Sequence, residues 1–134
     1  MATIWWEQAV AVPAAVAWAA LRRVDRAQVL FSPVLVDGCM HGDIRELVFA
    51  NGLQVKERIV SVDEQKRRVA YSAQGAPFEH HSASMQVVED ARGGCRLIWV
   101  SDFLPDTLEE AVRPLVIEGA AAFAANLEAG HSLD

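Results

Sequence analysis

Two strands joined by a turn at Asn51-Gly52 are the feature of this sequence that most restricts its fold. Asn-Gly is the preferred pair for a tight type I′ turn, because both central residues of that turn need positive φ. Residues counted in steps of two from the turn share one face of the hairpin, and they are Phe49, Leu47, Arg45, Leu53, Val55, Glu57 and Ile59. The hairpin, residues 43–63, therefore places one arginine and one glutamate among five large apolar side chains. Two charged side chains on such a face must pair with each other, contact water or bind a ligand.

The composition restricts the class of protein. A chain of 134 residues, 52% hydrophobic and 22% charged, fits one globular domain over residues 1–134 with a sizeable core. The net charge is -6 and the basic residues form no dominant block, so a nucleic-acid partner is not expected.

The apolar run at residues 9–21 does not read as a targeting signal. Glu7 precedes it and Pro13 interrupts it, whereas a signal peptide places positive charge before the run, and no stretch reaches the length of a membrane span. Cys39 and Cys95 show neither metal-ligand spacing nor a paired framework. We therefore expect free thiols, no metal and a cytoplasmic protein without a membrane span.

Periodicity and turn signals predict the order of the remaining elements. A first strand over residues 3–12 precedes a short helix over 14–23, and the stretch 25–42 has no clean period and reads as a connection with a partial helix or strand, such as a binding loop or lid. After the hairpin come three strands, at residues 68–74, 80–89 and 95–104. In the second of these His81 belongs to the inward set and His80 to the outward set, whereas periodicity does not choose between the two faces of the third.

A long helix ends the chain. Thr107 and Glu110 form a capping-box pattern, Pro114 should start a new helix or kink an existing one, and Gly130 should be the C-cap. Strands followed by a helix that covers their open face make an α+β fold.

Five segments, taken in order, resemble the Bet v 1-like or START-type (SRPBCC) superfamily of polyketide cyclase/dehydrase-like proteins. They are VPAAVAWAALRRVD, GDIREL, VKERIVSVDEQKRRVAYS, HHSASMQV and CRLIWVSDFLP. The resemblance covers nearly the whole chain. It implies a helix-grip fold, in which a curved antiparallel sheet wraps around the long C-terminal helix and encloses an apolar cavity.

Two subfamilies bear on the ligand. Plant abscisic-acid receptors are similar around ANGLQVKERI, with Glu57 where they have a ligand-contacting glutamate. Phe31 falls where they grip the hormone carboxylate with a lysine, and Gln54 falls where their gate has a proline, so abscisic acid is not the expected ligand. In lachrymatory factor synthase-like members, an arginine and a glutamate that act on the substrate fall at Arg45 and Glu57, and an inward tyrosine falls at His81.

These comparisons and the hairpin pattern lead to one site hypothesis. Glu57 acts as acid or base, Arg45 clamps an oxyanion or carboxylate, and His81 orients the substrate or exchanges protons itself. Two other interpretations stay open: Arg45 and Glu57 form a structural salt bridge, and His81 is merely hydrogen-bonded to a neighbour. The residues expected to line the ligand cavity are Phe31, Phe49, Val55, Ile59, Ala83, Met85, Leu115, Gly119 and Phe123.

The expected function is binding of a small hydrophobic or aromatic molecule inside the cavity. An enzyme of this kind would be a cofactor-free lyase or isomerase that drives cyclisation, dehydration or rearrangement by proton transfer. The alternatives are a non-catalytic carrier or sensor of lipophilic ligands, and an interaction module whose cavity is filled by its own side chains. No phosphate-binding loop or nucleophile motif appears, so no cofactor is expected. We expect a monomer or a homodimer.

Overall fold

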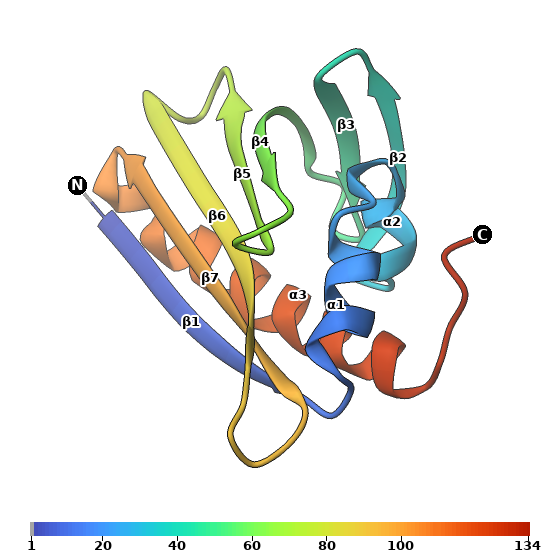
Figure 1. Cartoon of the computed structure of the whole chain (residues 1–134). Helices are drawn as coiled ribbons and strands as arrows, with labels where there is room; N and C mark the ends of the chain where they lie inside the picture. The colour runs from blue at the N-terminus through green and yellow to red at the C-terminus, as the bar shows by residue number, and fades with distance from the viewer. Residues whose placement is uncertain (1) are drawn as a thin grey trace.

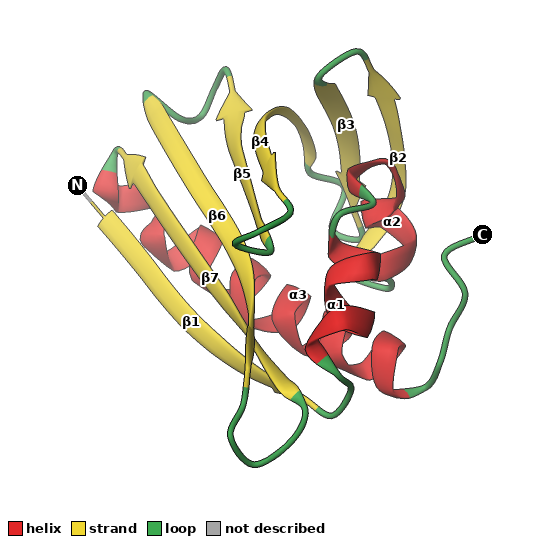
Figure 2. Cartoon of the chain, in the orientation of Figure 1, coloured by secondary structure: helices red, strands yellow, loops and turns green. Residues whose placement is uncertain are grey.

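A curved, seven-stranded antiparallel sheet and the long helix α3 that crosses its inner face make up most of the molecule (Figures 1 and 2). The computed structural model describes residues 2–134. The sheet runs in the order β1-β7-β6-β5-β4-β3-β2, and α1 and α2 lie beside α3 at one end. The strands are β1 (Ala2–Val10), β2 (Leu35–His41), β3 (Ile44–Phe49), β4 (Gln54–Asp63), β5 (Arg68–Gln74), β6 (His80–Glu89) and β7 (Cys95–Leu104). The helices are α1 (Ala14–Leu21), α2 (Ala27–Leu30) and α3 (Glu109–Glu128), with short 3-10 turns η1 (Val24–Arg26) and η2 (Asp106–Leu108).

This architecture confirms the predicted α+β helix-grip fold. The stretch 25–42, predicted to be a connection with a partial helix or strand, contains most of η1 and the whole of both α2 and β2. β2 is an edge strand with one buried residue, Leu35, so it carries little of the apolar alternation that marks a strand in the sequence. No helix within residues 2–134 is both long enough and apolar enough to cross a membrane.

The turn at Asn51-Gly52 differs from the predicted type I′ turn. Arg67 is the only non-glycine residue in the described range with positive φ, so Asn51 lacks the conformation that type I′ requires, while Gly52 has φ 91°. The Gly52 N–H donates to the Phe49 carbonyl (2.9 Å), and the Phe49 N–H donates to the Leu53 carbonyl (2.8 Å). These bonds define a three-residue loop with glycine in the left-handed position.

The length of this loop decides which side chains share a face. It pairs Arg45 with Glu57 across β3 and β4. A two-residue loop would shift the pairing by one residue and place Glu46 opposite Glu57, with Arg45 on the other face of the sheet. The predicted common face for Arg45 and Glu57 is therefore correct, although the predicted turn type is wrong.

The inner face of the sheet supplies the core. In β7 the set that includes Leu97 and Phe103 points inward, and both residues are fully buried, which resolves the choice that periodicity left open. In β6 the inward set of His81, Ala83, Met85 and Val87 is buried as predicted, and His80 is exposed.

The two halves of α3 contact the sheet differently. In the second half, Phe123 is fully buried, and a Cβ on Gly119 would lie 3.1 Å from Cζ3 of Trp99, so glycine lets the helix approach the sheet closely there. In the first half, Leu115 and its neighbours face an open cavity instead.

Both ends of α3 depart in part from the prediction. The helix begins at Glu109 after η2, without a side-chain hydrogen bond at its cap, so the predicted capping box of Thr107 and Glu110 does not form. The helix continues through Pro114 rather than restarting there. Gly130, with φ 72°, follows the last turn and its N–H donates to the Leu127 carbonyl, as predicted for a C-cap glycine.

Candidate functional site

A cavity of about 490 Å³ lies between the inner face of β4 to β7 and the first half of α3. Its wall is mostly apolar, and the polar side chains on it are Asn51, Glu57, Tyr71, His81 and Ser101. The volume falls within the range of small-molecule sites in proteins. The remaining lining residues are Phe49, Leu53, Val55, Ala73, Pro77, Phe78, Trp99, Leu108, Ala111, Val112, Leu115 and Val116.

A second, much smaller cavity of about 40 Å³ adjoins the first and shares five lining residues with it, Phe49, Glu57, Tyr71, Trp99 and Leu115. It has room for a water molecule or a small substituent rather than a whole ligand. Arg45 lines this small cavity and is absent from the wall of the large one.

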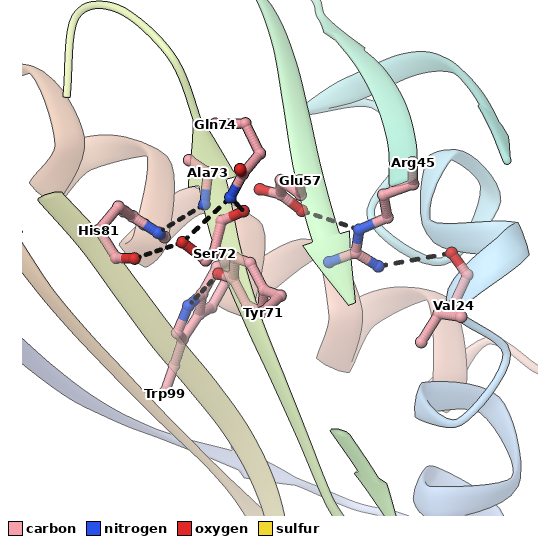
Figure 3. Close-up of polar contacts among 9 residues, drawn as sticks. All are labelled: Val24, Arg45, Glu57, Tyr71, Ser72, Ala73, Gln74, His81 and Trp99. Carbon is pink, nitrogen blue, oxygen red and sulfur yellow. Dashed lines mark hydrogen bonds and ion pairs between the residues drawn. The ribbon is translucent and has the colours of Figure 1, made fainter. Parts of the chain in front are cut away.

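Arg45 and Glu57 form a buried salt bridge. Arg45 Nε donates to Glu57 Oε1 at 2.8 Å, and the two residues are only 6% and 9% exposed. Arg45 also donates to the Val24 carbonyl at 3.4 Å, and its Cζ lies 5.2 Å from the centroid of the Tyr71 ring (Figure 3). The Glu57 carboxylate thus lies on the wall of the large cavity, and it is bound by the Arg45 guanidinium, which does not line that cavity.

Tyr71 and Trp99 add a hydrogen-bonded pair to the same wall. Trp99 Nε1 donates to the Tyr71 hydroxyl at 2.9 Å (Figure 3). Burial, together with the nearby negative charge of Glu57, raises the pKa of Tyr71 well above its usual range. The phenol therefore keeps its proton, and with Trp99 as its donor partner it has its own hydrogen to offer to an acceptor.

His81 is held as a neutral ring. Its Nδ1 accepts the backbone N–H of Ala73 at 2.9 Å, so the ring proton resides on Nε2, which lies 3.3 Å from Ser101 Oγ. Burial, reinforced by the charge of His80, lowers the pKa of His81 to about 4, against an opposing effect of Asp102. His81 Nε2 can thus donate to Ser101 Oγ, and both ring nitrogens are engaged within the protein.

Some of the residues predicted to line the cavity do line it. Val55 lies on the large cavity, Phe49 and Leu115 lie on both cavities, and Phe31, Met85 and Gly119 lie on the small one.

Ile59, Ala83 and Phe123 line neither cavity. The structure places Ala83 and Phe123 in the packed core and Ile59 against it.

Three polar residues of the cavity wall are missing from the site predicted from the sequence. Tyr71 alternates with Val69 and Ala73 and reads as an ordinary core aromatic, while Ser101 is a small residue in an apolar strand. Ser101 is 2% exposed and is recognisable only once β7 lies beside β6. Asn51 reads as a turn residue, and its side chain both accepts the Leu53 N–H and lies at the cavity.

Comparison with known protein families identifies the family of this chain. Residues 1–130 match the family described as polyketide cyclase / dehydrase and lipid transport. The chain belongs to this family. A comparison with curated protein sequences found no significant match to this polyketide cyclase/dehydrase family member.

Solved structures share the fold of this family member over nearly their whole length. XoxI from Bacillus cereus is 20% identical with a TM-score of 0.84, covering 98% of this chain and 100% of that one. A protein from Thermobifida fusca is 30% identical with a TM-score of 0.71, covering 92% and 91%. Norcoclaurine synthase from Thalictrum flavum, solved with dopamine and hydroxybenzaldehyde, is 18% identical with a TM-score of 0.74, covering 98% and 88%.

Proposed function

We propose that this protein binds a small apolar or aromatic molecule in the large cavity and that Glu57 accepts a hydrogen bond from a hydroxyl or amine of that molecule. One observation carries the proposal: among the described lining residues, Glu57 is the only carboxylate on a predominantly apolar wall. Arg45 already pairs with Oε1 of this carboxylate, and a ligand that brings a donor would satisfy further acceptor sites of the carboxylate on an otherwise apolar wall.

The size and character of the cavity support this ligand class. A volume of about 490 Å³ suits one small molecule, and Phe78, Trp99 and Phe49 offer aromatic surface to it. Norcoclaurine synthase, which shares the fold, was solved with dopamine and hydroxybenzaldehyde. Both are small aromatic molecules that carry hydroxyl groups, which is the kind of ligand proposed here.

The neutral probe N-phenylnaphthylamine tests binding, because it is aromatic and carries one amine donor. We expect it to bind in a ratio of one to one with enhanced fluorescence, and Glu57→Gln should weaken its binding about tenfold. Val112→Trp places a large side chain in the cavity and should abolish binding. The matched variant Val36→Trp alters an exposed valine on β2 and should change nothing. Unaltered binding in Val112→Trp would show that the probe does not occupy the cavity.

A second function, cofactor-free proton transfer, is favoured by the pairing of a base with a donor on one wall. Glu57 can accept a proton while Tyr71, which keeps its own, donates a hydrogen bond to an oxygen that gains charge. Arg45 is then a positioning residue that fixes the carboxylate, rather than a clamp on the substrate. A carrier or sensor would use the same groups for binding alone.

Nitrobenzisoxazole separates these two functions. Loss of its ring C–H proton to a base breaks the N–O bond and releases a coloured phenolate. A carboxylate base in an apolar cavity should accelerate this reaction over buffer, and Glu57→Gln should remove the acceleration. Binding of N-phenylnaphthylamine without acceleration of the ring opening would favour a carrier or sensor.

A further inference from the structure

Three metal-ligating side chains meet on the outer face of the sheet, away from the cavity. Cys39 and His41 are two residues apart in β2 and therefore project from the same side of the strand. Glu46 of β3 pairs directly with Cys39 in the register, which a two-residue turn at Gly42 and Asp43 sets by pairing His41 with Ile44. The backbone thus brings a thiol, an imidazole and a carboxylate together.

The separations between the three donor atoms are close to those around one metal ion. Cys39 Sγ lies 3.4 Å from His41 Nε2 and 3.7 Å from Glu46 Oε2. His41 Nε2 lies 3.5 Å from the same Glu46 oxygen. A tetrahedral zinc ion, with bonds of about 2.3 Å to sulfur and about 2.0–2.1 Å to nitrogen and oxygen, separates its ligand atoms by about 3.4–3.6 Å.

The surroundings of the three donor atoms leave one side open to solvent and orient the Glu46 carboxylate. Lys56 of β4 contacts Glu46 through the other oxygen, Oε1, at 3.3 Å, which leaves Oε2 facing Cys39 and His41. Such outer partners fix the orientation of metal ligands in many sites. Cys39 and His41 are exposed, so solvent can supply a fourth ligand.

We propose that Cys39, His41 and Glu46 bind one divalent transition-metal ion of the zinc class, with solvent as the fourth ligand. Thiolate and imidazole ligands favour zinc or cobalt over magnesium and calcium. The bound ion would link the edge strand β2 to β3 and so restrain an edge that is otherwise paired on one side only. This proposal differs from the prediction made from the sequence. No metal was expected there, because the spacing of the two cysteines does not match that of metal ligands.

Cobalt titration of the whole protein tests the site, because cobalt replaces zinc and reports its ligands in the absorption spectrum. We expect saturation at one equivalent, with a thiolate-to-cobalt charge-transfer band and the visible bands of tetrahedral cobalt, all removed by added zinc. Cys39→Ser should abolish the charge-transfer band, and His41→Ala and Glu46→Gln should each weaken binding at least about tenfold. Circular dichroism checks that these surface variants fold.

The chain supplies its own controls. Cys95→Ser alters the buried thiol and His131→Ala an exposed histidine elsewhere, so both should titrate like the unaltered protein. Binding of N-phenylnaphthylamine should be the same with and without metal, because the cavity lies on the other face. A charge-transfer band that survives Cys39→Ser, or titration without saturation near one equivalent, would overturn the proposal.

Discussion

Replacing Arg45 with methionine should lower the free energy of unfolding by about 3–5 kcal/mol. The substitution keeps much of the side-chain volume and removes the partner that lies 2.8 Å from Glu57 Oε1. The carboxylate, 9% exposed, is then left as an uncompensated buried charge. Urea unfolding followed by circular dichroism measures the difference.

Arg58 offers a matched control one residue beyond Glu57 in β4. Its guanidinium lies 2.8 Å from Asp43, at the same separation, but the two side chains are 51% and 57% exposed. Arg58→Met should therefore cost less than about 1 kcal/mol. If the two methionine variants lost similar amounts of unfolding free energy, burial would not determine how much the Arg45 ion pair stabilises the protein.

The double variant Arg45→Met/Glu57→Leu separates stability from binding. It removes both charges and fills the space with apolar groups, so most of the lost stability should return. It also removes the carboxylate from the cavity wall, so N-phenylnaphthylamine should lose its hydrogen-bond acceptor. A stable double variant with weakened binding would indicate that this ion pair serves the ligand more than the fold.

The hairpin shows how far local pattern determines the site. Alternation alone placed Arg45 and Glu57 on one apolar face, and the structure pairs them directly. Alternation did not specify that Glu57 faces the large cavity while Arg45 lies behind it. That division depends on α2 and β2, because Arg45 lines the small cavity with Ala27 and Leu35 and bonds to the Val24 carbonyl.

Residues whose roles depend on contacts from one strand to another could not be recognised from the sequence. Tyr71 on β5 accepts a hydrogen bond from Trp99 on β7, 28 residues away, and so keeps its own hydroxyl hydrogen for a ligand. Cys39 and Glu46 are seven residues apart and meet because β2 and β3 pair in one particular register. Periodicity reports which face a residue occupies, whereas partners across strands follow from register, which one residue in a turn can change.

His81 should make the protein less stable as the pH falls from about 6.5 to about 4. The pKa of His81 is about 4 in the folded protein and near the ordinary 6.5 once the chain unfolds. Below 6.5 the unfolded state binds a proton that the folded state excludes, so stability falls by about 1.4 kcal/mol per pH unit and by about 3 kcal/mol in all. Below about pH 4 both states are protonated and this contribution becomes constant.

The difference between the unaltered protein and His81→Asn isolates this effect from the titration of carboxylates. Asparagine can still accept the Ala73 N–H through its side-chain oxygen and has no group that titrates in this range. Unfolding free energies measured from pH 7 to pH 4 should therefore fall more steeply for the unaltered protein than for this variant. His80→Asn, one residue away and exposed, should retain most of the steep fall. Parallel pH profiles for the unaltered protein and His81→Asn would mean that the folded protein takes up a proton at His81 as readily as the unfolded chain, and that the ring is free to exchange protons with a ligand in the cavity.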